Sequence, residues 1–419
     1  MLPFLLFAIY LFAACWMITK SSFIRQAGLK TGTILTLFLL KISAGIALGW
    51  MSKQYYPGND YWTMNQEGQL EYQLLIDHPG DFFSGIFHSV YAHYNGFFDS
   101  VGSYWNDLKN NLIIKSLAIC NIFSRGNYYI NSLFFNTVAF FALVALYRVF
   151  IRLFPGKQLA VILGCFLVPS TLYFTSGIYK DLVIASMLGF YSYALYFGSL
   201  ERFTYRRIIL LLISFLCILL IRNYVAVVLV PFSFAFIASS RFKQPAWMVF
   251  AISILFCLLA IWLTPLFSEK LNPLAVIVQK QRDFAALPVA STQIPMQTLE
   301  AKPSSFIKAM PQALNHGFLR PYLWETSGRF LWPMAFEILA LLVLFVICLF
   351  FRNSSALIRQ PFLLFGLCTG FVLLLLTGYI IPNLGSIVRY RSIYMPYLLT
   401  PLLCLADGWL EKWNKRIIF

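Results

Sequence analysis

The sequence is poor in acidic residues. Its 419 residues include 16 Asp and Glu against 32 Lys and Arg, and Asp60 is the first acidic residue of the chain. Charged residues amount to only 11% of the total, whereas 60% are hydrophobic. Many apolar runs approach the ~20 residues that a helix needs to cross the hydrocarbon core of a bilayer. This composition predicts an all-α polytopic membrane protein with a single integral domain over residues 1–419.

Two further absences argue against a nucleic-acid-binding protein and against a disulfide-stabilised one. No run of five or more basic residues occurs, so we expect the net charge of +16 to set membrane topology and not to bind nucleic acid. Seven of the eight cysteines fall in apolar runs, and only Cys120 does not, so no disulfide framework is predicted. The first apolar stretch lacks a basic leader and a cleavage site, which predicts that it remains as a transmembrane helix.

The hydrophobic pattern predicts about eleven spans, with 10–12 as the range. They cover residues 2–19, 32–50, 129–147, 158–175, 182–199, 208–221, 224–239, 246–266, 330–350, 361–380 and 393–408. The region 208–239 has two interpretations, either two spans that meet at a tight turn or one broken helix.

Basic residues fall in alternate loops of this arrangement, which places those loops in the cytoplasm and the N-terminus outside. The C-terminus is then cytoplasmic, and two long segments, residues 51–128 and 267–329, lie outside. These two outer regions carry most acidic residues and all four histidines, which are His78, His88, His93 and His316. Their apolar residues are spaced for amphipathic helices that lie along the membrane surface, where they line a site or form a lid without chemistry.

Asp60 follows the second span, at the outer membrane surface, with Glu67 nearby. A carboxylate there can accept a proton from a sugar hydroxyl as a general base, or it is an ordinary loop charge. No Asp-x-Asp pair is present, so no metal site is predicted. Lys180 and Asp181 lie together at an outer junction between spans. Either Lys180 binds a phosphate that Asp181 orients, or the two charges neutralise each other at a helix start.

Arg222 lies in "LLIRNYV", between apolar residues. An arginine in this setting needs a spatial partner, which is either a phosphate group or one of the outer carboxylates. In "HGFLRPYLWE", His316, Arg320 and Glu325 precede a span, and Glu337 lies inside it. Arg320 and Glu325 either serve a site or form a stabilising ion pair. Glu337 is costly at membrane depth unless it faces the interior of the bundle.

Arg389 and Arg391 occur two residues apart in "GSIVRYRS". In an extended loop both side chains would point to one side, whereas on a helix they would diverge. They either hold a lipid diphosphate or anchor the chain to anionic head groups. The predicted topology brings five basic side chains and one carboxylate to the same outer surface; these are Lys180, Arg222, Arg320, Arg389, Arg391 and Asp60.

Five segments of the chain resemble the bacterial integral-membrane glycosyltransferases of the GT-C type and the related Wzy-like polysaccharide polymerases. They are "PGNDY", "PSTLYFTSGIYKD", "IRNY", "RPYLWE" and "GSIVRYRSIYMPYL". The resemblance implies a polyprenyl-phosphate-linked sugar as donor and transfer at the extracytoplasmic face of the bacterial inner membrane. The sequence identifies no cofactor and leaves a requirement for a divalent metal open. By position the resemblance implies that Asp60 is the base and that Arg222, Arg389, Arg391 and Lys180 stabilise the leaving phosphate. In this family the aspartate commonly follows the first span, whereas Asp60 follows the second.

Three functions fit these observations. The first is a glycosyltransferase of cell-envelope glycan assembly, with a polymerase of lipid-linked oligosaccharide repeats as a close variant. The second is a transporter or flippase of lipid-linked sugars, which would share the basic residues but would not need a base. The third is a non-catalytic membrane subunit. No internal repeat is evident and the charges gather at one face, which favours an enzyme over a transporter.

Overall fold

A computed structural model describes residues 2–56, 58–85, 104–242, 244–267, 272–288, 291–325, 331–350 and 360–417. Over these ranges the regular structure is helical, without β-strands, and one isolated bridge joins Gln293 and Asn383. The structure is thus consistent with the predicted all-α membrane protein. The predictions for His88 and His93 fall outside the described residues.

Seven helices of the described part are long and apolar enough to cross a membrane. They are α1 (Leu2–Lys20), α3 (Thr31–Tyr55), α7 (Tyr128–Leu153), α10 (Lys180–Leu200), α12 (Asn223–Arg241), α13 (Ala246–Phe267) and α18 (Pro361–Ile380). Two shorter apolar stretches lie in α16 (Trp332–Phe350) and α20 (Met395–Ile417). The predicted number of eleven spans is therefore not confirmed.

The structure divides two regions of the chain in which the sequence predicts spans into shorter helices. The region 158–175 is divided into α8 (Gln158–Phe166) and α9 (Pro169–Phe174), so it is not one continuous helix. The region 208–239 forms two helices, α11 (Tyr205–Ile221) and α12, and Arg222 is the single residue between them. Both interpretations of this region, two spans at a tight turn and one broken helix, stay predictions.

The helices divide into two compact units. Unit 1 comprises Met1–Val149, Leu172–Tyr193 and Ile209–Asn223, and unit 2 comprises Phe150–Thr171, Ala194–Ile208 and Tyr224–Phe419. The further helices of unit 1 are α2 (Ser22–Arg25), α4 (Asp60–Asp77), α5 (Pro79–Ser84) and α6 (Tyr104–Ser124). Those of unit 2 are α14 (Pro273–Ala285), α15 (Pro303–Leu314), the π-helix η2 (Asn315–Leu319) and α19 (Leu384–Ser392).

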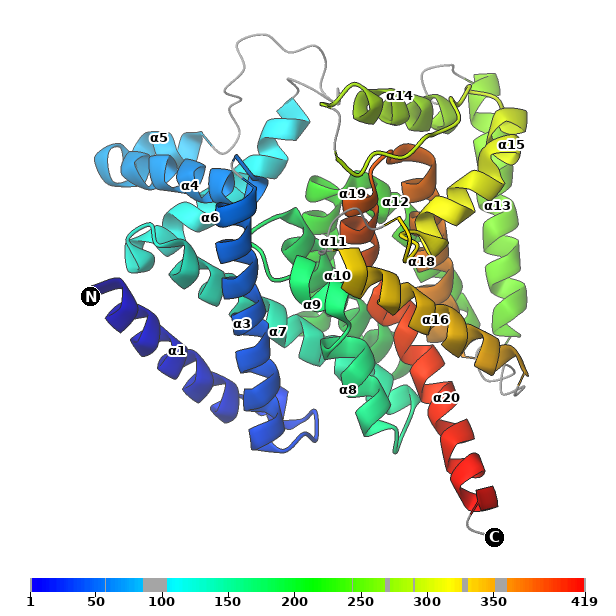
Figure 1. Cartoon of the computed structure of the whole chain (residues 1–419), viewed down its shortest axis with the longest axis horizontal. Helices are drawn as coiled ribbons and strands as arrows, with labels where there is room; N and C mark the ends of the chain where they lie inside the picture. Colours follow the sequence, from blue (N-terminus) through cyan, green and yellow to red (C-terminus); the bar gives the residue numbers. More distant parts are fainter. Residues whose placement is uncertain are drawn as a thin grey trace. The chain divides into compact units, whose positions relative to one another are not determined.

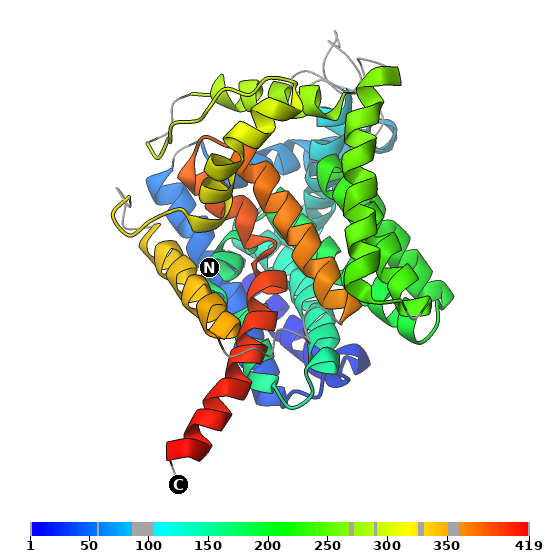
Figure 2. The ribbon, with the colours of Figure 1, turned by 90° about the vertical axis from the view of Figure 1, so that its right-hand side faces the viewer.

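The predicted outer regions contain helices that run across their neighbours. Figure 1 shows α4 and α5 lying roughly crosswise to α3 in unit 1. Figure 2 shows α14 lying crosswise to the upright α13 in unit 2. Apolar helices that cross a bilayer stand along its normal, whereas amphipathic helices lie in its surface. The location of residues 51–128 and 267–329 at the outer membrane surface stays a prediction.

Helix α4 begins at Asp60 because Asn59 caps it. The Asn59 side chain accepts hydrogen bonds from the backbone N–H groups of Tyr61 and Trp62, at 3.1 and 3.2 Å. Asp60 then occupies the first turn, where a negative charge suits the helix dipole. Gly68 lets α4 approach α6 closely, since a side chain there would meet Leu117 at 2.7 Å. The cap and this contact fix the position of Asp60.

Helix α18 of unit 2 packs tightly against α15 and η2. A side chain at Gly317 would collide with the carbonyl oxygen of Leu374, and one at Gly378 would collide with that of Ala313. Only glycine allows the backbones to approach this closely. An apolar cluster that includes Val278, Phe306, Ala309, Ala313 and Tyr379 fills the space beside this contact. The segment around His316 is therefore held firmly in place.

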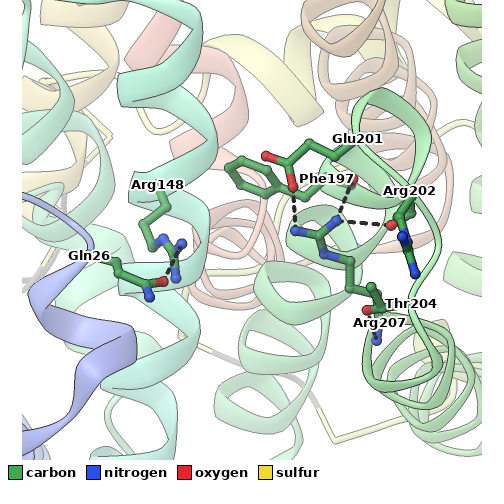
Figure 3. Close-up of polar contacts among 7 residues, drawn as sticks. All are labelled: Gln26, Arg148, Phe197, Glu201, Arg202, Thr204 and Arg207. Atoms are coloured by element: carbon green, nitrogen blue, oxygen red, sulfur yellow. Dashed lines mark hydrogen bonds and ion pairs between the residues drawn. The ribbon is translucent and has the colours of Figure 1, made fainter.

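Basic side chains of two loops predicted to be cytoplasmic have partners within the protein (Figure 3). Arg207 donates a hydrogen bond to the backbone oxygen of Arg202 at 2.9 Å, and it pairs with Glu201 at 2.5 Å. In unit 1, Arg148 donates to the side-chain oxygen of Gln26 at 3.0 Å. Both arginines therefore have hydrogen-bond partners within their own unit.

Candidate functional site

Asp181 and Arg222 form a buried ion pair in unit 1. The Asp181 side chain is fully buried and that of Arg222 is 6% exposed, and Nη2 of Arg222 donates a hydrogen bond to Oδ1 of Asp181. Asp181 lies in the first turn of α10, and Arg222 lies between α11 and α12. Of the two partners expected for Arg222, the structure thus contains the carboxylate. This ion pair ties the start of α10 to the junction of α11 and α12.

Lys180 and Asp60 lie near each other, because the residues next to them in the chain are in contact. The rings of Tyr61 and Tyr179 meet at 5.8 Å between centroids, and each ring belongs to the residue next to one of these charges. The positive charges of Lys109 and Arg222 and the carboxylates of Asp60 and Asp181 all act on the half-buried Lys180. Asp60 itself is exposed. An accessible carboxylate therefore lies close to an ammonium group.

Glu67 belongs to the same set. Partial burial raises its pKa above the ordinary glutamate value, and the nearby charge of Lys180 lowers it in part. We call Asp60, Glu67, Lys180, Asp181 and Arg222 the unit 1 cluster. It combines an exposed carboxylate, a cation and a buried ion pair, and its residues come from α4, α10 and the α11–α12 junction.

Sequence reasoning missed Lys41. This lysine lies within α3 and is 1% exposed, and its Nζ donates hydrogen bonds to the backbone oxygen and the hydroxyl of Thr175, at 2.6 and 2.9 Å. Thr175 follows directly after α9 and precedes Lys180 by five residues. A charged residue inside an apolar span was the available signal, because such residues are rare at membrane depth. Lys41 anchors the segment that leads to Lys180.

Arg391 is the most buried cation of unit 2. It is 1% exposed, and its Nη1 donates to the backbone oxygens of Arg320 and Gly317, at 2.6 and 3.3 Å. Within the described ranges its Nε and Nη2 atoms have no hydrogen-bond partner. Burial lowers its pKa to about 10, which the charge of Glu337 partly counteracts. The guanidinium group is therefore protonated at neutral pH and keeps two donors without an acceptor.

Glu337 faces the interior of unit 2, as its position in an apolar helix requires. It is 7% exposed, and it accepts hydrogen bonds from the backbone N–H and the hydroxyl of Ser170, at 2.7 and 2.6 Å. Its charge acts on Arg391, but the ion pairs of the described residues do not include one between these two. Glu337 thus balances part of the buried charge without occupying the free donors of Arg391.

Arg320 and His316 lie on the chain segment that Arg391 contacts. Arg320 pairs with Glu325 at 3.2 Å, which is the ion pair expected from the sequence. Its Nε and Nη1 atoms have no hydrogen-bond partner in the described structure, and neither has Nδ1 of His316, which is 2% exposed. We call Arg391, Arg320 and His316 the unit 2 cluster. It holds five buried nitrogen atoms without a hydrogen-bond partner among the described residues.

Arg389 does not point the same way as Arg391, because the segment is helical. Helix α19 begins after Asn383, whose side chain accepts from the N–H of Ser386 at 3.2 Å, and it continues to Ser392. Side chains two residues apart on a helix are separated by a rotation of about 200° around the helix axis. Arg391 is accordingly buried, whereas Arg389 is half-buried above the ring of Tyr390. Of the two alternatives for this spacing, extended loop and helix, the structure has the helix.

Eight of the eleven predicted site residues therefore fall into two clusters, one in each unit, and Glu325, Glu337 and Arg389 belong to neither. The predicted gathering of all five basic residues at one surface stays a prediction. No group of three or more His, Cys, Asp or Glu residues in the described ranges is placed to hold a metal ion. Comparison of the chain with protein-family models, with curated proteins and with solved structures finds no match.

Acidification is expected to destabilise the protein through His316. Burial, followed by the charge of Arg320, lowers the pKa of His316 from 6.5 to about 4. Because the folded pKa lies below the unfolded one, this contribution to stability is complete above about pH 6.5 and is lost as the pH falls towards 4. The apparent unfolding temperature in detergent should fall more steeply between pH 7 and pH 4.5 for the wild type than for His316→Asn. Parallel pH profiles would contradict this assignment.

Proposed function

We propose that this protein is an integral-membrane glycosyltransferase that uses a polyprenyl-phosphate-linked sugar as donor. The observation that carries the proposal is the buried guanidinium group of Arg391, which keeps two unpartnered N–H donors. Buried polar groups are nearly always hydrogen-bonded, so these donors indicate a ligand with acceptor atoms. Phosphate offers such acceptors and a matching negative charge, and arginine is well suited to bind it.

The proposed reaction takes its base from the resemblance of "PGNDY" and its phosphate ligands from the unit 2 cluster. The carboxylate of Asp60 takes the proton of an acceptor hydroxyl, and the oxygen attacks the anomeric carbon of the donor sugar. The bond from this carbon to the phosphate oxygen breaks, and the polyprenyl phosphate leaves with the electron pair. Arg391 and Arg320 hold the phosphate. Such fixed charges stabilise the negative charge that builds up on the leaving group.

The same proposal includes the place of the reaction. The seven apolar helices support a multi-pass membrane protein. Basic residues in alternate loops support an orientation in which Asp60 and Arg391 face the extracytoplasmic side of the bacterial inner membrane. Lipid-linked sugars for cell-envelope glycans are used at this side, so the proposed reaction belongs to glycan assembly.

Replacing Arg391 with glutamine tests the proposed phosphate site. The loss of charge-assisted hydrogen bonds, worth about 1.5–3 kcal/mol, should weaken polyprenyl phosphate binding about 10- to 100-fold. Binding is measured on the full-length protein in nanodiscs, with the unfolding temperature as a check of the fold. Arg207→Gln is the matched control, because Arg207 has its own partners in the protein. Equal affinities of Arg391→Gln and the wild type would refute the phosphate site.

A further inference from the structure

The nitrogen atoms of the unit 2 cluster gather around one short chain segment. His316 and Gly317 belong to the π-helix η2, and Arg320 follows it directly. Arg391 reaches this segment from α19 and binds it through two backbone oxygens, those of Gly317 and Arg320. A π-helix is rare and occurs frequently at functional sites. The two arginines and the histidine are thus parts of one local structure.

His316 is fixed in this structure and lacks a partner for one nitrogen. Its neighbour Gly317 packs against the backbone of α18 without room for a side chain, so the histidine cannot shift easily. Its Nδ1 atom is buried and unpartnered among the described residues. A buried polar atom without a hydrogen bond costs free energy, which a bound ligand group would recover.

The chemistry of this nitrogen differs from that of the two arginines. The guanidinium groups only donate and carry charge, so they suit the oxygen atoms of an anion. An uncharged imidazole nitrogen either donates or accepts, depending on which nitrogen carries the proton. The low pKa of His316, about 4, keeps the ring uncharged at neutral pH. A hydroxyl group both donates and accepts, so it satisfies Nδ1 in either form.

We infer that His316 binds a hydroxyl group of the sugar whose phosphate Arg391 and Arg320 hold. This inference rests on the proposed function and adds a residue that selects the sugar part of the donor. The phosphate contacts then contribute affinity for any phosphate ester. The contact of His316 distinguishes a glycosyl phosphate from an ester without hydroxyl groups.

Soluble phosphate esters test this assignment. Methyl phosphate is compared with the 1-phosphates of glucose, galactose and N-acetylglucosamine, by competition with polyprenyl phosphate on the full-length protein in nanodiscs. At least one sugar phosphate should bind the wild type about 3- to 10-fold more tightly than methyl phosphate, the range expected for one added hydrogen bond. His316→Asn should keep this preference, because the asparagine amide lies close to the position of Nδ1. His316→Gln should lose it, because its amide lies near the other ring nitrogen.

The outcomes separate this inference from the proposed function. A sugar preference that survives in His316→Gln, or that is absent from the wild type while methyl phosphate still binds, overturns the role of His316 alone. Failure of methyl phosphate to compete in the wild type overturns the phosphate site as well. Methyl phosphate should bind both His316 variants as tightly as the wild type. The two variants have similar size and polarity, so a difference in folding does not explain opposite results.

Discussion

Replacement of Arg222 by leucine should destabilise the protein by about 3–5 kcal/mol, the range measured when one partner of a buried ion pair is removed. The reason is the environment of Asp181, which is fully buried and would keep a charge without its partner. The expected loss is large compared with the overall stability of about 5–15 kcal/mol that is usual for folded proteins. Unfolding by SDS in mixed micelles measures it on the purified full-length protein.

Two control variants test whether this loss of stability comes from the buried ion pair. The double variant Asp181→Leu with Arg222→Leu should recover much of the loss, since an apolar pair of similar volume does not leave a buried charge. Arg207→Leu removes a partly exposed ion pair, that with Glu201, and should cost about 1 kcal/mol or less. If Arg222→Leu were as stable as Arg207→Leu, the ion pair with Asp181 would not be a structural element of unit 1.

Replacement of Asp60 by asparagine should slow glycosyl transfer by about 10²- to 10⁴-fold, the usual contribution of a general base. Asparagine keeps the shape of the side chain but cannot take the proton of the acceptor hydroxyl. Binding of the donor lipid should remain, because the proposed phosphate ligands are Arg391 and Arg320. Transfer from a polyprenyl-phosphate sugar in proteoliposomes measures the rate.

Asp77→Asn provides the matched control, because Asp77 is an exposed carboxylate at the other end of α4. It should transfer the sugar at the wild-type rate. Full transfer activity of Asp60→Asn would place the base elsewhere. Movement of lipid-linked sugar across the bilayer that is unaffected by Asp60→Asn, without any transfer, would instead support a transporter.

Features that depend on local sequence could be predicted. Long apolar runs give helices such as α3 and α18, because length and hydropathy alone decide whether a helix suits a bilayer. The pairing of Arg320 with Glu325 was also accessible, since the two residues lie five positions apart in the chain. The sequence predicted that Arg222 has a spatial partner, but it did not identify Asp181 as that partner.

Features that depend on distant residues could not be predicted. The contact between α9 and α16 could not be predicted, because the carboxylate that accepts from the N–H of Ser170 is Glu337, 167 positions later. Lys41 was hidden in an apolar run, and its partner Thr175 lies 134 positions away. Each case needs knowledge of which helices become neighbours.

The contact between Glu337 and Ser170 has a consequence for how the chain enters the membrane during synthesis. A charged side chain at the centre of a helix opposes insertion by the translocon by about 2.5–3.5 kcal/mol, and Glu337, which lies nearer the start of α16, opposes it by less. Helix α16 carries Glu337, so we expect it to enter the bilayer less readily than an apolar helix of the same length. Ser170, earlier in the chain, is already present when α16 emerges and can receive the carboxylate. Insertion of α16 should therefore depend on α9, because Ser170 of α9 donates hydrogen bonds to Glu337 of α16.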